Sequence, residues 1–225
     1  RKDTGAGTTT WNHYQEAVHD FAWNTQPRSQ VLKIVRAFKA DERVSPAEIA
    51  EWSRKTGAPP EEVRLQDVQV TLFIQREHAA QADRHFRATF AGLKWFGLMY
   101  GKYPYDVVTV VDPPYGGLGA GGMEYPTFFT AGTRYWPAAR QLSPEGVTVH
   151  EFGHQFWYGL VGNNEFEEAW LDEGFNSYST SKVLAMEYGP DYSYERVFGV
   201  PIPARTWLEL PVPRYPWFRV KGIGI

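Results

Sequence analysis

Two stretches decide the fold of this chain, HEFGH at residues 150–154 and WLDEGF at residues 170–175. On a helix, positions i and i+4 share a face, so His150 and His154 can each direct one imidazole nitrogen at the same metal ion. Glu151 lies about 100° round the helix from His150, which keeps it out of the ligand set but beside a water on the open metal position. The spacing therefore predicts a metal site that activates water, with Glu151 as the general base.

A catalytic zinc ion usually takes three protein ligands and one water, so another part of the chain must supply the third ligand. We expect the helix that carries HEFGH to begin at Ser143 and to end at residues 162–164, where glycine and asparagine tolerate a left-handed turn. A second helix is expected to begin at Glu165 and to pack against the first through apolar side chains. Glu173 would then face the two histidines, which predicts one zinc ion as the cofactor.

The rest of the chain has the periodicity of alternating strands and helices. The patterns predict strands at residues 31–39 and 68–74, an apolar run at 107–111 and a long helix from residue 82 to residue 97. A capping box at residues 45–48 predicts a short helix that ends near Gly57. The expected fold class is α+β, with a small mixed sheet beside the two zinc-bearing helices and a substrate cleft between the sheet edge and the metal.

A glycine-rich segment follows the apolar run and imitates a dinucleotide-binding fingerprint through Gly117, Gly119 and Gly122. That fingerprint must open a helix, whereas the aromatic residues 123–129, which a proline interrupts, are typical of an edge strand. Nucleotide binding is therefore disfavoured. A glycine-rich strand edge instead lets an extended peptide approach the backbone and pair with it, which suits a peptide substrate.

The composition argues against several classes of protein. The chain has 225 residues and a formal net charge of −3, so it offers no basic surface for nucleic acid. No apolar run is long enough to suggest a membrane span in this segment. Because the chain contains no cysteine, disulfides and thiolate metal ligands are excluded.

Two further histidines fall near the long predicted helix. His78 and His85 are seven positions apart and can share one helix face. A lone histidine on a mainly polar face is usually solvated or hydrogen-bonded to the backbone, and we expect this for both residues. We assign neither of them to the metal.

The chain resembles a known family, the gluzincin aminopeptidases, which include alanyl aminopeptidase and the leukotriene hydrolase. The resemblance runs through VHDFAW at residues 18–23, GKYPY at 101–105, GAGGMEYP at 119–126 and the block from HEFGH to WLDEGFNSY. It implies a thermolysin-like zinc peptidase catalytic domain. It also implies a peptide substrate with a free N-terminus.

The segment before the zinc motif matches the part of the family that binds substrate. Gly121, Gly122, Met123 and Glu124 correspond to a Gly-x-Met-Glu-Asn segment whose glutamate holds the free amino group of the substrate. Tyr125 stands where the family has asparagine. The resemblance therefore implies that the protein removes residues from the N-terminus of peptides.

The resemblance also suggests how the chain is divided. Residues 1–30 are expected to be the remnant of a β-rich N-terminal domain, and residues 31–225 a catalytic domain truncated at its C-terminal side. Flanking domains of the full-length protein are expected for the same reason. A family tyrosine that stabilises the oxyanion is expected beyond Ile225, so these residues are expected to bind zinc and to hydrolyse peptides poorly.

Two alternatives stay open. A thermolysin-type endopeptidase would share the metal chemistry and differ only at the pocket for the substrate's amino group. A noncatalytic scaffold that keeps the metal site is the other alternative, although the retained Glu151 argues for catalysis.

Overall fold

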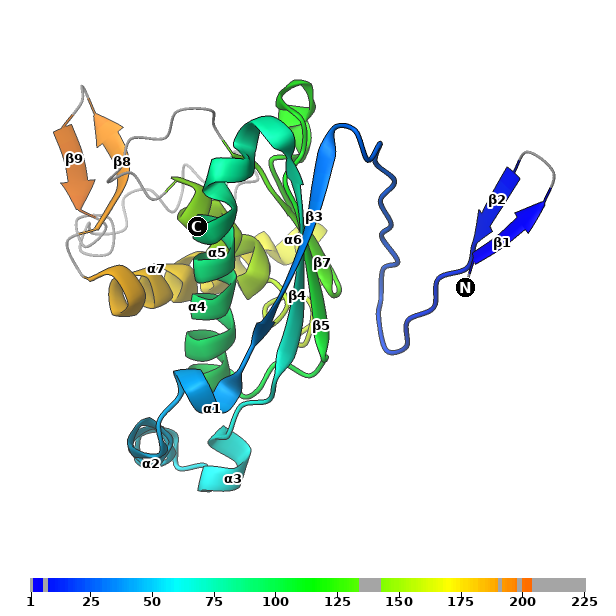
Figure 1. The fold of residues 1–225 in the computed structure, drawn as a ribbon. Helices are drawn as coiled ribbons and strands as arrows, with labels where there is room; N and C mark the ends of the chain where they lie inside the picture. The colour runs from blue at the N-terminus through cyan, green and yellow to red at the C-terminus, as the bar shows by residue number, and fades with distance from the viewer. Residues whose placement is uncertain (1, 6–7, 134–142, 190–191, 198–199, 204–225) are drawn as a thin grey trace.

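A mixed five-stranded sheet with helices on one face forms the body of this computed structural model (Figure 1). The structure describes residues 2–5, 8–133, 143–189, 192–197 and 200–203. In spatial order, the strands of the sheet are β3 (Val31–Phe38), β4 (Val68–Gln75), β5 (Val107–Val111), β7 (Phe128–Ala131) and β6 (Gly122–Tyr125). Strands β4, β5 and β7 are parallel, and the edge strands β3 and β6 are antiparallel to their neighbours. The expected α+β class and mixed sheet are confirmed.

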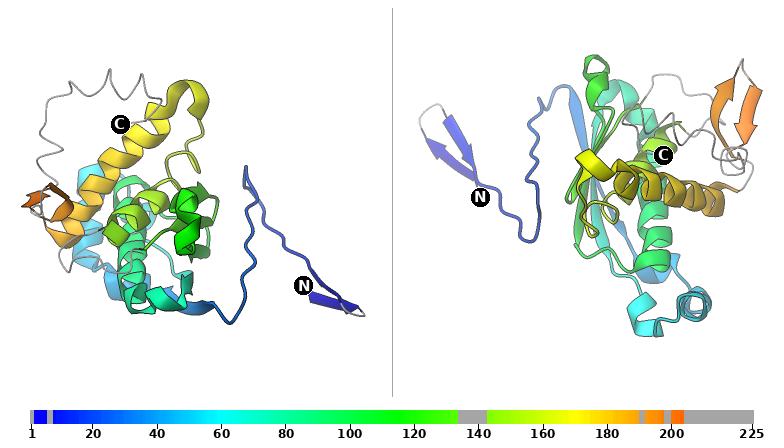
Figure 2. Two further views of the ribbon diagram at one scale, coloured as in Figure 1. Left: turned by 90° about the horizontal axis from the view of Figure 1, so that it is seen from above. Right: turned by 180° about the vertical axis from the view of Figure 1, so that it is seen from behind.

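Three long helices lie on the same side of the sheet, as the view from behind also shows (Figure 2). They are α4 (Ala82–Tyr100), α5 (Ser143–Gly153) and α7 (Phe175–Tyr188). The remaining helical elements connect the strands and helices: α1 (Ala40–Arg43), α2 (Pro46–Thr56), α3 (Pro60–Val63), η1 (Arg76–Gln81), η2 (Tyr115–Ala120), α6 (Glu165–Ala169) and the π-helix η3 (Trp170–Gly174). Of these, α2 is as long as α5. The predicted capping box is present at the start of α2, where Ser45 and Glu48 cap each other, and Gly57 ends the helix with a φ of 75°.

Two hairpins complete the described chain. Strands β1 (Lys2–Gly5) and β2 (Thr8–Trp11) pair near the N-terminus, and the hairpin stands apart from the sheet in both figures. Strands β8 (Ser193–Val197) and β9 (Val200–Pro203) pair after α7. The assignment of residues 1–30 to a separate domain stays a prediction.

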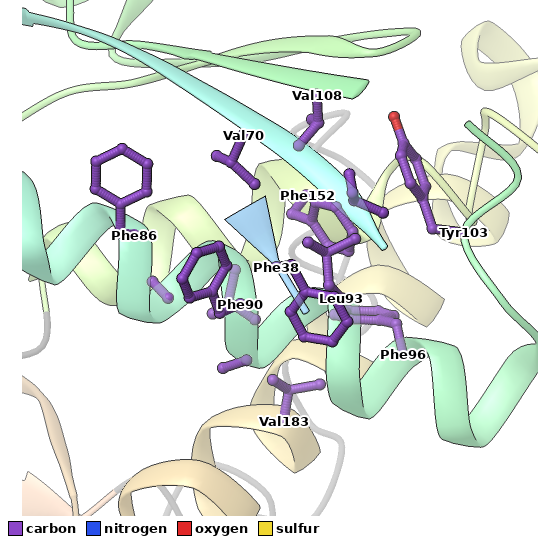
Figure 3. Close-up of a cluster of buried hydrophobic side chains, with 14 of the residues drawn as sticks. Phe38, Val70, Phe86, Phe90, Leu93, Phe96, Tyr103, Val108, Phe152 and Val183 are labelled. Atoms are coloured by element: carbon purple, nitrogen blue, oxygen red, sulfur yellow. The ribbon is translucent and has the colours of Figure 1, made fainter. Parts of the chain in front are cut away.

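The core lies between the sheet and the helices and is rich in aromatic rings (Figure 3). Phe96 of α4 stacks on Phe156 at a ring-centroid distance of 5.5 Å and meets Phe152 of α5 at 6.2 Å. Gly92 permits this close approach, because a Cβ atom there would lie 2.4 Å from Cδ1 of Phe152. Helix α5, which carries the HEFGH residues, is therefore held directly against the longest helix of the fold.

The helix that carries HEFGH begins at Ser143, as predicted, but it ends at Gly153 and does not reach residues 162–164. The amide of His154 still bonds to the carbonyl oxygen of His150 at 3.3 Å, so the two histidines keep their helical spacing. Beyond them Tyr158 has a φ of 93°, a left-handed conformation that a continuous helix cannot contain. The predicted position of the helix end was wrong because the left-handed turn occurs at Tyr158, a residue type that disfavours it, and not at the glycine and asparagines of residues 162–164.

The second helix begins at Glu165, as predicted, but it is not continuous. Glu168 has non-helical dihedral angles, with φ −130° and ψ 46°, and α6 ends at Ala169. The π-helix η3 follows and leads directly into α7. Glu173 therefore lies in a widened turn and not in a regular α-helix.

The expectation for His78 and His85 was wrong, because both side chains are buried. Nδ1 of His78 lies 2.6 Å from Oδ2 of Asp112, and the ring of His85 contacts the hydroxyl groups of Thr133 and Thr148. Their partners are side chains from distant strands and helices, which sequence periodicity does not reveal. Neither histidine belongs to a cluster of potential metal ligands among the described residues.

Among the described residues, no helix has both the length and the apolar character that crossing a membrane requires.

We predict that burial of His85 makes the protein less stable in acid. Burial, together with the neighbouring Arg84 and His78, lowers the pKa of His85 from its ordinary 6.5 to about 3. Between these two values the unfolded chain binds a proton that the folded protein does not. The stability is therefore complete above about pH 6.5 and falls as the pH decreases, by up to about 1.4 kcal/mol per pH unit.

Urea unfolding at about pH 7 and about pH 5 measures this effect. His85→Gln keeps a side chain that can bond to the two threonine hydroxyls but cannot take up a proton. The free energy of unfolding should fall between about pH 7 and about pH 5 in both proteins, and we expect the fall to be about 2 kcal/mol smaller in this variant than in the wild type. His13→Gln, at an exposed position, is the control and should behave like the wild type. Equal losses in all three proteins would contradict the prediction.

Candidate metal centre and active site

Three side chains predicted as metal ligands lie together in the structure. Nε2 of His150 is 3.2 Å from Nε2 of His154 and 3.0 Å from Oε2 of Glu173. The third side of this triangle, from Nε2 of His154 to Oε2 of Glu173, measures 3.7 Å. Three potential donor atoms from two separate segments therefore converge on one point and could hold a metal ion.

The approach of the two segments depends on a glycine and an asparagine. A Cβ atom on Gly153 would lie 1.9 Å from Oδ1 of Asn176 and 2.6 Å from Cζ of Phe96. Nδ2 of Asn176 donates to the carbonyl oxygen of His150 at 2.7 Å. Helix α7 is therefore tied to the backbone of one candidate ligand, and this brings η3 next to α5. The sequence motifs do not identify Asn176, because its role depends on this contact between distant segments.

His154 is contacted through its other ring nitrogen as well. Nδ1 lies 3.2 Å from the carbonyl oxygen of Trp157 and 2.6 Å from Oδ1 of Asp172. The side chains of His154 and Asp172 are almost completely buried, at 1% and 4% exposed. The sequence motifs do not identify Asp172 either. The directions of the Asp172 and Glu173 side chains follow from the sequence only if both lie in an α-helix, and the π-helix that contains them was not expected.

Glu151 lies close to the candidate ligand His154, and its carboxylate is buried. Among the described residues, none provides a hydrogen-bond partner for Oε2 of Glu151. Burial raises the pKa of Glu151 to about 8; the positive charge of His154 opposes the rise, and the nearby carboxylates add to it. A raised pKa makes this carboxylate a stronger base than an exposed glutamate, which suits the role of general base.

The edge strand β6 brings Gly122 and Glu124 to the same site. A Cβ atom on Gly122 would lie 2.4 Å from Oε1 of Glu151, so only glycine leaves room for the carboxylate at this position. Glu124 lies two residues further along, on the same face of the strand, and its carboxylate approaches Glu151 and His154. Met123 alternates to the opposite face and is 41% exposed.

The remaining predicted glycine, Gly121, precedes β6. Its carbonyl oxygen accepts a hydrogen bond from the amide of Gly132 at 2.6 Å, which extends the pairing of β6 with β7. At the other end of the hairpin, Gln155 donates from Nε2 to the carbonyl oxygen of Tyr125 and accepts at Oε1 from the amide of Thr127. Gln155 follows His154 directly, so the edge strand is attached to the segment that carries the histidines.

The electrostatic character of the site is strongly acidic. Carboxylates of Glu124, Glu151, Asp172 and Glu173 surround His154. Burial opposes the charged form of His154, but the contact with Asp172 and the negative charges of Glu124 and Glu173 raise its pKa to about 9. Burial also raises the pKa of Glu124, whereas the hydrogen bond from His150 holds the pKa of Glu173 below its usual value despite burial. Such a site favours a cation.

Comparison with known proteins finds no matching family model. Several curated proteins are similar over part of the chain. Leucine aminopeptidase 2 of Ajellomyces capsulatus is 33% identical over 101 residues, which cover 44% of this chain and 15% of the relative. Aminopeptidase B of Mus musculus is 33% identical over 125 residues, or 52% of this chain and 17% of the relative. Leukotriene A-4 hydrolase of Xenopus laevis is 29% identical over 147 residues, or 62% of this chain and 22% of the relative.

The fold is similar to a solved structure as well. The crystal structure of Legionella pneumophila aminopeptidase A in complex with aspartic acid matches 72% of this chain and 17% of that chain, with a TM-score of 0.52 and 13% sequence identity. At this identity the similarity concerns the fold alone. The matched parts make up between 15% and 22% of the curated relatives. Over that part, the resemblance of this chain to the aminopeptidases and leukotriene A-4 hydrolases is confirmed.

Proposed function

We propose that this chain carries the zinc site and the catalytic base of an aminopeptidase. The observation that supports the proposal most directly is the triangle formed by His150, His154 and Glu173, with sides of 3.0, 3.2 and 3.7 Å. In a tetrahedral site with zinc–ligand bonds of about 2.0–2.1 Å, neighbouring donor atoms are about 3.4 Å apart. Two imidazoles and one carboxylate are also a known ligand set of catalytic zinc in peptidases.

The charges around the triangle support a bound divalent cation. Four carboxylates converge there, and burying them close together without a positive charge is unfavourable. A zinc ion held by these residues would polarise the scissile carbonyl and lower the pKa of its water. Glu151 accepts the proton of the attacking water and transfers it to the leaving amine, and its Oε2 atom is available for this because no described residue bonds to it.

Glu124 is proposed to bind the α-ammonium group of the substrate. Its carboxylate approaches Glu151 and His154. Glu124 lies in strand β6, whose outer edge has no neighbouring strand among the described residues. A peptide that pairs with this edge would place its N-terminus near Glu124 and its first peptide bond near Glu151. A carboxylate fixed one residue away from the cleaved bond favours removal of the N-terminal residue over cleavage within a chain.

We predict that Glu151→Gln abolishes peptide hydrolysis and leaves zinc binding intact. Removal of a general base typically lowers kcat by about 10²- to 10⁴-fold. The measurements are zinc content by elemental analysis and hydrolysis of amino-acid anilides by the intact protein. Wild type and variant should each hold one equivalent of zinc.

Two outcomes separate the alternatives. A scaffold without catalytic activity would show no hydrolysis in the wild type and no change in the variant. A wild-type protein that holds no zinc after dialysis against zinc-containing buffer would contradict the proposed site itself.

We predict that Glu124 distinguishes free from blocked N-termini. A hydrogen bond to a charged group contributes about 1.5–3 kcal/mol, so Glu124→Ala should lower kcat/KM for a free peptide by about 10- to 100-fold. N-acetylation of the substrate should lower wild-type activity to a similar extent and have little further effect on the variant. Equal cleavage of free and acetylated peptides by the wild type would favour a thermolysin-type endopeptidase.

We predict that Gly122→Ala lowers kcat without weakening zinc binding. The new methyl group would meet Oε1 of Glu151 at 2.4 Å and would displace the carboxylate from its position. A displaced base is expected to cost at least about tenfold in kcat, because catalysis depends on sub-ångström placement. Gly116→Ala is the control, since nothing lies within 4 Å of a Cβ atom there. If both variants keep wild-type kcat, the contact between Gly122 and Glu151 has no role in catalysis.

A further inference from the structure

Two consecutive acids of the π-helix η3 contact the two nitrogens of one imidazole ring. Oδ1 of Asp172 lies 2.6 Å from Nδ1 of His154, and Oε2 of Glu173 lies 3.7 Å from Nε2 of the same ring. We propose that Asp172 is a positioning residue that acts through His154 and strengthens the binding of the metal. The inference rests on the proposed zinc site and adds to it a residue that the sequence motif does not identify.

The π-helix provides the geometry for this double contact. Successive residues of an α-helix point about 100° apart, so two neighbours rarely face the same partner. In η3 the amide of Phe175 bonds to the carbonyl oxygen of Trp170, five residues earlier, which widens the turn; it also bonds to the carbonyl oxygen of Asp172. Asp172 is buried by this turn, and Glu173 beside it stays 39% exposed at the candidate metal position.

The contacts of Nδ1 decide which nitrogen of His154 carries the proton. Nδ1 makes a hydrogen bond to the carbonyl oxygen of Trp157 at 3.2 Å, and Oδ1 of Asp172 lies 2.6 Å from the same nitrogen. A neutral imidazole has one N–H donor and one acceptor nitrogen, so the proton belongs on Nδ1. The lone pair of Nε2 then points to the side where His150 and Glu173 lie, as a metal ligand requires.

The carbonyl oxygen of Trp157 would be sufficient to select this tautomer, and Asp172 adds a negative charge. The side chain of Asp172 is only 4% exposed, so solvent screens that charge little. A carboxylate close to the far nitrogen of a ligating histidine raises the basicity of the ligand and favours one ring orientation. The structure therefore assigns to Asp172 an electrostatic effect on the metal in addition to a geometric one.

Three variants test this inference by zinc affinity, measured by competition with a chromophoric chelator. Asp172→Asn keeps an oxygen acceptor and loses the charge, and Asp172→Ala loses both. Loss of such a partner typically weakens metal binding by about 10- to 100-fold, so we expect about 10-fold for Asp172→Asn and up to about 100-fold for Asp172→Ala. The control is Glu145→Gln. Glu145 is a buried acid of α5, the helix that carries His150, and it pairs with Arg84 at 2.6 Å. It belongs to no group of candidate ligands among the described residues.

The visible spectrum of the cobalt(II)-substituted protein is the second measurement. Its ligand-field bands depend on the ligands and their geometry, so they should shift in the Asp172 variants and stay unchanged in Glu145→Gln. Circular dichroism shows which variants are folded; if Asp172→Ala does not fold, the isosteric Asp172→Asn decides the outcome alone.

The outcomes distinguish this inference from the proposed function. If the wild type does not bind zinc, the proposed zinc site fails. If the wild type binds zinc and Asp172→Asn binds it within about twofold with the same cobalt spectrum, only the role of Asp172 is overturned. An equal loss of affinity in Glu145→Gln would also overturn it, because the effect would then follow from the loss of any buried acid near α5.

Discussion

The strongest constraint on this molecule is the negative charge that its fold concentrates in one place. Glu124, Glu151, Asp172 and Glu173 come from an edge strand, a helix and a π-helix, and all of them lie close to His154. Carboxylates that are removed from water repel one another and require a positive partner. A divalent cation at the proposed zinc position would supply that partner, with both imidazoles neutral so that each offers a nitrogen lone pair to the ion.

The rest of the structure serves to bring these acids together. Glycines lie where the elements approach each other most closely, because a side chain would not fit there. Gly92 lies against Phe152, Gly122 against Glu151 and Gly153 against Asn176. Each contact joins α5 to a different element, namely α4, β6 and α7. Because protein interiors pack densely, small changes at these positions are expected to displace the functional groups themselves. Packing and chemistry are therefore linked in this fold through one helix.

Much of the fold followed from local patterns. The strands at β3 and β4, the capping box of α2 and the beginning of α5 at Ser143 depend on neighbours in the chain, and the sequence predicts them. The end of α5 did not follow, because Tyr158 adopts a left-handed conformation that residue type disfavours. The buried state of His78 and His85 did not follow either, since it depends on Asp112, Thr133 and Thr148, which are distant in the sequence.

The sequence by itself identified His150, His154 and the base Glu151 as one group, because the helical period relates their spacing to direction. It identified Glu173 as the candidate third ligand, and the packing of η3 against α5 brings that side chain to the histidines. Only the tertiary structure decided that Asp172 contacts His154 and that Gly122 leaves room for Glu151. The physical reason is that these contacts join segments whose relative position depends on the packed core and on a π-helix, neither of which has a local sequence signal.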